Sequence, residues 1–350
     1  MARYYTRACN FYYGKTSKSL VKNKKSLPLN GNKEISFDQI ELISRNSKKK
    51  IKINRLSNLP KILKKQITQD LKNITSKKKN FANLNFNKSP NIMGILNLTP
   101  DSFSDGGKFN STTKGIKQAL KMFESGASII DVGGESTKPG SKGINVKLEW
   151  NRINKILRSI SKKIPISLDT RKSEIMQKGI KLGVKVINDV SGLNYDPKTI
   201  NILKKYKIPF VLQHSQGTPE KMQNNPVYEN VLLDIYDFFD KKINFLRSIG
   251  IKHNNIIIDP GIGFGKNLKH NMNIICNISI FHSLGFPILV GISRKKFIKE
   301  LSGDNDTKNR TGGTVSSVIY LMIQGVQILR VHEVNEILQG IKVFKNLIKN

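Results

Sequence analysis

The stretch 164–189, with the sequence IPISLDTRKSEIMQKGIKLGVKVIND, decides the fold class of this chain. It begins and ends with short apolar runs, 164–169 and 184–189, and each of these runs closes on an aspartate. The amphipathic segment between them, 172–182, has the length of a short helix. A strand, a helix and a second strand in this order predict a βαβ unit, whose two strands run parallel because a helix connects them.

The same alternation continues on both sides of this stretch. Apolar runs predict eight strands, at 91–97, 128–133, 164–169, 184–189, 208–213, 255–259, 287–292 and 327–331. Helices are predicted between and after them, at 114–125, 146–162, 172–182, 198–206, 231–248, 270–284, 314–325 and 335–348. Eight such units in residues 90–350 predict a (β/α)8 TIM barrel, which typically takes about 250 residues. A doubly wound open sheet is the alternative, but it would be expected to have fewer units and an early glycine-rich phosphate turn.

Residues 1–89 differ in composition from the predicted barrel. The chain of 350 residues has a net charge of +35, and residues 1–90 hold 22 Lys and Arg against 4 Asp and Glu. Lysine runs interrupt this region, and two segments within it are predicted to be structured: 35–43 as a short strand or helical turn, and 59–71 as an amphipathic helix. We expect a small, basic, partly structured N-terminal extension of unknown role ahead of a catalytic domain at 90–350.

An organellar transit peptide is the alternative interpretation of the N-terminus. Arg3 and Arg7 precede Glu34, which is the first acidic residue, and this arrangement is typical of transit peptides. A cluster of aromatic residues argues against it, namely Tyr4, Tyr5, Phe11, Tyr12 and Tyr13.

The composition also limits the class of function. No stretch approaches the roughly 18 consecutive apolar residues of a membrane helix, so no membrane partner is expected. Cys9 and Cys276 are too few for a disulfide framework or a Cys-based zinc site, and we expect a reducing, cytoplasmic compartment. The basic charge would fit a nucleic-acid-binding protein led by the extension. Lys, Asn and Ile are abundant together, however, and they share A/T-rich codons, so codon composition explains the charge better and no nucleic-acid partner is expected.

Polar residues stand at or just after the end of every predicted strand. The carboxyl ends of barrel strands meet at one rim, where active sites of TIM barrels are built. A single aspartate could be a helix cap, but a polar residue at all eight ends is hard to explain structurally. The residues are Asn97, Asp131, Asp169, Asn188, His214, Asp259, Ser293, and Arg330 with His332.

Two loops after the first two strands carry distinctive motifs, NIMGILNLTPDSFSDGG at 91–107 and DVGGESTKPGS at 131–141. Together they resemble the two signature segments of the dihydropteroate synthase family. The likeness covers about residues 90–348 and continues through SLDT at 167–170, INDVSG at 187–192, DPGIGFGK at 259–266, GISRK at 291–295 and RVHE at 330–333.

The resemblance implies a transferase of folate biosynthesis. The family condenses 6-hydroxymethyl-7,8-dihydropterin pyrophosphate with para-aminobenzoate to give 7,8-dihydropteroate and pyrophosphate, by an SN1-like mechanism. It also implies a homodimer and Mg2+ as cofactor, with Asn97 as the metal contact.

The resemblance assigns site residues by their positions in the motifs. Asp169, Lys295 and Asn97 are expected to be catalytic. The pterin is expected to contact Asp169, Asn188, Asp259, Lys295 and Phe264. The pyrophosphate group is expected to contact Asn97, Thr137, Lys138, Arg330 and His332, and the aminobenzoate Phe103, Thr137, Pro139 and Ser293.

Two positions depart from the family pattern. Lys138 replaces the usual arginine, which keeps the charge but loses the forked donor geometry. Gln213 replaces an apolar residue that would cover the pterin, so the pocket floor is expected to be more polar. Two rival functions are the pterin-binding barrel of corrinoid methyltransferases, which has no need of the aminobenzoate loops, and a homologue that only binds pterin.

Overall fold

The computed structural model describes residues 3–87, 90–99, 108–138, 140–218 and 220–348, and of residues 108–111 it describes the backbone. The predicted site residues Phe103 and Pro139 lie outside the described residues. No helix in the described part of the chain has both the length and the apolar composition needed to cross a membrane.

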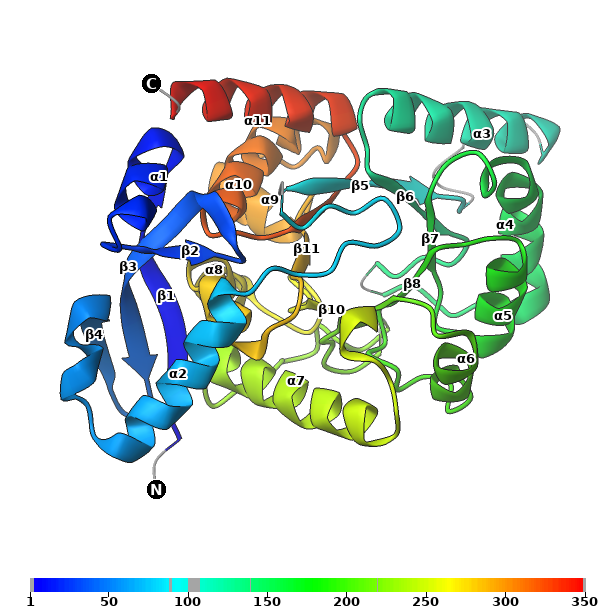
Figure 1. The fold of residues 1–350 in the computed structure, drawn as a ribbon. Helices are drawn as coiled ribbons and strands as arrows, with labels where there is room; N and C mark the ends of the chain where they lie inside the picture. The colour runs from blue at the N-terminus through cyan, green and yellow to red at the C-terminus, as the bar shows by residue number, and fades with distance from the viewer. Residues whose placement is uncertain (1–2, 88–89, 100–107, 139, 219, 349–350) are drawn as a thin grey trace.

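Eight parallel strands form a barrel, which confirms the predicted fold (Figure 1). Neighbouring strands pair in the order β10, β9, β8, β7, β6, β5, β12 and β11. A parallel bridge between Ile258 and Ile288 joins the two ends of this sheet, and the Ile258 amide donates to the Pro287 carbonyl at 3.0 Å. The strands are β5 (Asn91–Asn97), β6 (Ile129–Gly133), β7 (Ile166–Asp169), β8 (Val186–Asp189), β9 (Phe210–Gln213), β10 (Ile256–Asp259), β11 (Leu289–Gly291) and β12 (Ile328–Val331).

Helices cover the outside of the barrel. They are α3 (Lys108–Glu124), α4 (Val146–Ile160), α5 (Ser173–Lys181), α6 (Thr199–Tyr206), α7 (Val231–Ser248), α8 (Leu268–Cys276), α9 (Lys296–Ser302), α10 (Thr311–Ile323) and α11 (Val334–Leu347), with short 3-10 helices η3 (His253–Asn255), η4 (Ile278–Leu284) and η5 (Lys308–Arg310).

One helix prediction was wrong. The single helix predicted at 270–284 is divided into α8 and η4, because Asn277 leaves helical geometry with φ −120° and ψ 21°.

Side-chain alternation along the strands separates an apolar layer of the barrel interior from a polar one. Seven strands each give one residue to the buried apolar layer, and Phe86 and Leu84 from the segment before β5 close it. On β7 this position is the buried Ser167. Two residues further along each strand, on the same face, the barrel carries mostly polar side chains. The apolar layer consists of Met93, Ile129, Val186, Val211, Ile257, Leu289 and Ile328, and the next layer of Ile95, Asp131, Asp169, Asn188, Gln213, Asp259, Gly291 and Arg330.

The N-terminal region is fully folded over its described residues, so the expectation of a partly structured extension was wrong. Its long strand β3 pairs antiparallel with β1, β2 and β4. The sheet and α2 enclose a separate core that includes Phe37, Ile40, Ile67 and Ile74. The exposed faces of these elements carry many lysines, so the amino-acid composition of the region does not reveal that it has an apolar core. The elements are β1 (Tyr5–Tyr13), α1 (Gly14–Lys22), β2 (Leu27–Leu29), β3 (Asn32–Ile43), β4 (Lys48–Lys52), η1 (Ile53–Asn58) and α2 (Lys61–Thr75).

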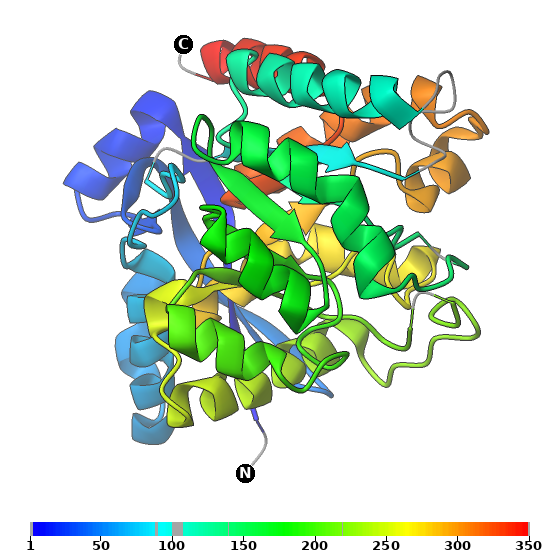
Figure 2. The same cartoon turned by 90° about the vertical axis from the view of Figure 1, so that its right-hand side faces the viewer.

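The N-terminal sheet packs on the outside of the barrel beside η4, α7 and α10. The Ser279 hydroxyl donates to the Ala8 carbonyl at 2.9 Å, and the Tyr13 hydroxyl donates to the Ile323 carbonyl at 2.8 Å. Arg45 forms ion pairs with carboxylates that include Asp234, at 2.9 Å. In Figure 2 the blue N-terminal elements lie to the left, whereas β5 points to the right. The region therefore lies away from the rim on which the predicted site residues stand.

Candidate active site

Arg330 connects four strands at the carboxyl rim of the barrel. Its Nε donates to Asp131 Oδ2 at 2.6 Å, and its Nη2 donates to Asp169 Oδ2 at 2.8 Å. The Asn188 amide donates to the same Asp131 oxygen at 2.9 Å. The structure thus brings Arg330, Asp169 and Asn188 together, as the sequence predicted for strand ends, and it adds Asp131. The polar ending of its strand was noted, but Asp131 was given no role in the site.

Burial dominates the electrostatics of this group. It raises the pKa of Asp169, the nearby Asp131 raises it further, and Arg330 opposes both effects. Burial by itself would lower the pKa of Arg330. The carboxylates of Asp131 and Asp169 have the larger effect, so the pKa of Arg330 is raised. Arg330 is therefore a permanently charged, fixed cation, with its guanidinium oriented before any substrate binds.

A second cluster joins the end of β10 to the segment before α9. The Lys295 ammonium donates to the Ile262 carbonyl and lies 4.4 Å from the centre of the Phe264 ring. Burial lowers the pKa of Lys295 to about 8, with Asp259 opposing the shift. Burial raises the pKa of Asp259 to about 6, and the Gly261 amide opposes this through a 2.7 Å hydrogen bond. Three predicted pterin contacts, Asp259, Phe264 and Lys295, are therefore neighbours.

Gly261 is required by the backbone at this turn. Its φ is +66°, and a Cβ atom placed there would lie 2.0 Å from the His214 carbonyl oxygen. Any side chain would push the β9 and β10 ends apart.

His214, at the end of β9, contacts a buried lysine, Lys266, whose ammonium lies 3.0 Å from His214 Nδ1. Burial lowers the pKa of both groups, and their contact joins the end of β9 to the 261–266 loop.

Ser293 and His332, assigned by sequence to different substrates, lie side by side. The Ser293 hydroxyl is 2.9 Å from His332 Nδ1 and donates to Glu333 Oε2 at 3.2 Å. Glu333 also forms an ion pair with Arg294. Burial, with the surrounding cations Arg294 and Arg330, lowers the pKa of His332 to about 3. The imidazole is therefore neutral at physiological pH and surrounded by positive charge.

The other predicted residues lie at the margin of these clusters. Asn97 ends β5 and is partly buried. Thr137 is partly buried, and Lys138 is exposed on the second loop. Gln213, the departure on β9, is 3% exposed and pairs in register with Asp259. Its amide therefore stands in the polar layer beside the carboxylate of Asp259, which is predicted to bind the pterin.

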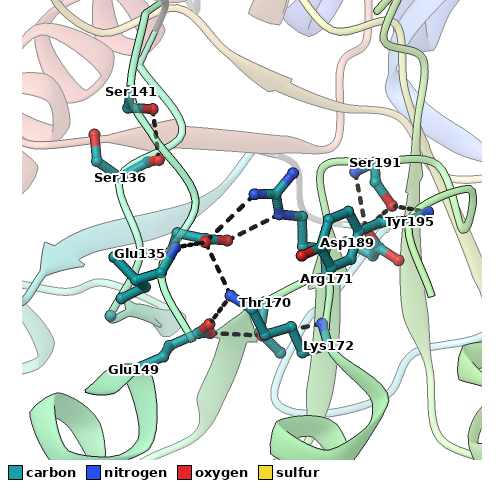
Figure 3. Close-up of polar contacts among 12 residues, drawn as sticks. Glu135, Ser136, Ser141, Glu149, Thr170, Arg171, Lys172, Asp189, Ser191 and Tyr195 are labelled. Atoms are coloured by element: carbon teal, nitrogen blue, oxygen red, sulfur yellow. Dashed lines mark hydrogen bonds and ion pairs between the residues drawn. The ribbon is translucent and has the colours of Figure 1, made fainter. Parts of the chain in front are cut away.

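A buried ion-pair network holds the base of the second loop (Figure 3). Glu135 accepts from Arg171 Nε and from Lys172 Nζ, both at 2.9 Å. Lys172 also contacts Glu149, which accepts from the Thr170 hydroxyl at 2.6 Å. Burial favours the neutral acid, but the hydrogen bonds from Arg171 and Lys172 prevail and lower the pKa of Glu135.

This network lies directly after Asp169 in the chain, and sequence reasoning missed it. Glu135 also accepts from the Ile144 amide at 2.9 Å, so one carboxylate connects both ends of the second loop to the end of β7. The motif segments contain the necessary acids and bases, but their pairing requires the fold.

A family model described as a pterin binding enzyme matches residues 93–332, from β5 to the last residue of the proposed anion site. The chain belongs to this family. This pterin-binding enzyme is 39% identical over 254 residues to the dihydropteroate synthase of Synechocystis, covering 72% of this chain and 88% of the relative. It is 39% identical over 256 residues to the dihydropteroate synthase of Escherichia coli, covering 73% of this chain and 90% of the relative.

Solved structures of the same family superpose on the barrel. The Yersinia pestis dihydropteroate synthase in a sulfonamide drug complex has a TM-score of 0.70 and 35% identity, over 75% of this chain and 95% of that one. The Xanthomonas albilineans enzyme with 4-aminobenzoic acid has a TM-score of 0.70 and 33% identity, over 74% and 93%. The predicted family, and with it the predicted transferase of folate biosynthesis, is confirmed.

Proposed function

We propose that this pterin-binding enzyme joins 6-hydroxymethyl-7,8-dihydropterin pyrophosphate to para-aminobenzoate, giving 7,8-dihydropteroate and pyrophosphate. The observation that carries the proposal is the position of Arg330, which is held between Asp131 and Asp169. It stands close enough to the cluster of Lys295 and Asp259 for its charge to help lower the pKa of Lys295. A pterin offers a planar edge of donors and acceptors next to a leaving group that is an anion. One rim of the barrel carries hydrogen-bonding groups that match the pterin edge and a cation that matches the leaving group.

The pterin is assigned to the Asp259 side of the rim. The Asp259 carboxylate can accept two hydrogen bonds from the amine and ring nitrogen of the pterin edge. The Asn188 Oδ1 atom is buried and has no partner among the described residues, so it can accept from a ring donor. Lys295 donates to the ring carbonyl, and Phe264 packs on the ring face. A wrong ring would leave these buried groups unpaired, which gives strong discrimination.

Arg330 and His332 would bind the leaving pyrophosphate, with Asn97, Thr137 and Lys138 at the edge. The forked guanidinium of Arg330 suits phosphate oxygens. His332 with its hydrogen on Nε2 can donate to the anion. These groups stabilise negative charge as the C–O bond breaks. The ionised form of Asp169, which Arg330 favours, stabilises the pterin cation that forms on the other side. The neutral aryl amine then attacks, so no strong base is required.

The aminobenzoate is assigned to Ser293 and to the first two loops. The carboxylate of the aminobenzoate can accept a hydrogen bond from the Ser293 hydroxyl. The hydroxyl then donates to the substrate and no longer to Glu333. Thr137, and by resemblance Phe103 and Pro139, would line this second pocket. The Glu135 network fixes the base of the second loop, so the loop can close over the substrates and exclude water without losing its attachment.

Mg2+ fits this site as a partner of the pyrophosphate. The described residues contain no group of three or more His, Cys, Asp or Glu side chains that could hold a metal ion. Asn97 supplies one neutral oxygen, and Mg2+ commonly uses phosphate oxygens and water for its other ligands. When bound, the ion would neutralise charge on the leaving group.

We further propose a cytoplasmic homodimer. Tyr320 on α10 and Val343 and Leu347 on α11 are large apolar side chains that are 42%, 57% and 70% exposed. The two helices pack against each other. Sedimentation velocity on the full chain and on Tyr320→Lys tests this: a dimer that becomes monomeric supports it, and a monomeric wild type contradicts it.

A pyrophosphate-release assay with both substrates tests the function. We expect turnover that depends on para-aminobenzoate and is lost in Lys295→Ala. Lys299→Ala on the exposed face of α9 is the matched control, since it removes a lysine four residues away. A wild type that shows no aminobenzoate-dependent release would refute the assignment and favour a barrel that only binds pterin.

A further inference from the structure

A lysine-lined cavity of about 180 Å³ lies between the N-terminal region and the barrel. One wall is the end of α2 and the segment after it. The other wall consists of residues just before β10 and β11, at the amino ends of these strands. The candidate active site stands at the opposite, carboxyl ends of the same strands. The cavity is lined chiefly by Lys72, Ser76, Lys77, Lys78, Lys79 and His253.

The charge of this cavity is one-sided. No aspartate or glutamate is among its lining residues in the described part of the chain. None of its four lysines has an ion pair with a described residue. This contrasts with the remaining contact between the N-terminal region and the barrel, where Arg3 pairs with Asp237 and Asp240, and Arg45 with Asp234. Four like charges around a small space repel one another unless an anion joins them.

Lys78 is the most constrained of the four lysines. Lys78 is 8% exposed, and its ammonium donates to the Asn73 carbonyl at 2.7 Å. Asn73 lies in the last turn of α2, so this bond satisfies one free carbonyl of the helix end. An ammonium has three donors, and a helix cap uses one of them. Burial lowers the pKa of Lys78 to about 8, and no carboxylate opposes the shift. A buried cation with one neutral acceptor is costly without a counter-charge.

We propose that this cavity binds a small anion with one or two phosphate groups, which connects the N-terminal region to the amino end of the barrel. The lysine ammonium groups supply the positive charge, and the Ser76 hydroxyl a neutral donor. The enclosed volume suits a phosphate or diphosphate and not the long open groove along which a nucleic-acid backbone binds. Inorganic phosphate and the pyrophosphate product share this chemistry.

His253 gives a direct readout. Its ring packs on Phe286 with centroids 4.1 Å apart, and its Nε2 lies 3.2 Å from the Gly285 carbonyl oxygen. Because Nε2 donates to this carbonyl, Nδ1 can donate to an anion once the ring is protonated. The chain has five histidines, of which His332 reports on the active site. Imidazole nitrogen signals of the full chain, labelled with 15N-histidine, can therefore follow both sites during one titration. His253→Gln assigns the signal.

The experiment titrates inorganic phosphate, pyrophosphate and a single-stranded RNA separately, at constant ionic strength. We expect a saturable shift of the His253 signal towards the imidazolium form with phosphate or pyrophosphate. Its midpoint rises by about tenfold or more in Lys78→Met. The His332 shift produced by pyrophosphate stays unchanged in that variant. Whichever of the two anions saturates His253 at the lower concentration identifies the source.

Two matched variants keep the test decisive. Lys65→Met removes an exposed α2 lysine outside the cavity and is expected to leave the titration unchanged. Lys79→Met removes an exposed lining lysine and is expected to weaken binding even if Lys78→Met does not fold. The proposal is overturned if neither anion moves His253 saturably, if Lys78→Met and Lys79→Met titrate like the wild type, or if RNA alone moves the signal.

Discussion

Arg330 on β12 donates a 2.8 Å hydrogen bond to Asp169 on β7, a residue 161 positions earlier in the chain. Two other strands, β5 and β6, separate β12 from β7 in the sheet order. The contact therefore passes through the interior of the barrel. It fixes the orientation of the guanidinium that is proposed to receive the leaving pyrophosphate.

Arg330→Lys is expected to lower kcat and to destabilise the protein by about 2 kcal/mol, because a single ammonium nitrogen cannot occupy both positions from which Nε and Nη2 donate to Asp131 and Asp169. Steady-state kinetics with both substrates and urea unfolding measure the two effects. Arg158→Lys, on the exposed face of α4, is the control. Equal kinetics for the two variants would contradict a role for the fork.

Gly261→Ala is expected to cost several kcal/mol of stability, since the residue has φ +66° and its Cβ would lie 2.0 Å from the His214 carbonyl oxygen. Thermal unfolding of the purified variant measures this. Gly312→Ala in α10 meets nothing within 4 Å of the added Cβ and is expected to be neutral or to stabilise by up to about 1 kcal/mol. The reverse order of the two melting temperatures would show that the turn tolerates a side chain.

Glu149→Gln is expected to lower stability by about 3 kcal/mol, because it leaves the buried Lys172 with a weaker partner. The KM for aminobenzoate is expected to rise more than that for the pterin substrate, since the network holds the second loop. Glu174→Gln removes an exposed i,i+4 pair with Lys178 and is expected to change stability by less than about 0.5 kcal/mol. A purely structural network would leave both KM values unchanged.

His282 is expected to make the protein sensitive to acid. Burial lowers its pKa to about 4, below its ordinary value of 6.5. The unfolded chain therefore binds the proton more tightly, so the stabilisation is complete above pH 6.5 and is lost as the pH falls towards 4. Between pH 7 and pH 5 the wild type is expected to lose about 2 kcal/mol more than His282→Gln. Urea unfolding at both pH values measures this, and parallel losses in the two proteins would rule it out.

Lys138→Arg restores the residue that is usual in the family at an exposed loop position. It is expected to lower the KM for the pyrophosphate substrate by a factor of about three, because a forked donor gains one charge-assisted hydrogen bond. Lys142→Arg, in the same segment, is the control. An unchanged KM in Lys138→Arg would indicate that this lysine does not contact the leaving group.

The sequence by itself determined the barrel and the rim on which the site residues stand. Strand length and spacing, as in 164–189, predict parallel βαβ units because these patterns are local. Polar residues such as Asp169 and Asn188 end their strands, and topology alone then brings them to one edge. The motifs also identified the family, and the comparisons confirm it.

Only the tertiary structure decided which of these side chains meet and how they are charged. The pairing of Arg330 with Asp131, the link of Glu135 to Lys172, and the contact of Ser293 with His332 join residues distant in the chain. Their pKa values depend on burial, which no local pattern records. The N-terminal core likewise forms from residues on β1, β3 and α2 that are buried only when the sheet closes on the helix. Local periodicity fixes the elements, whereas burial and long-range pairing fix the site.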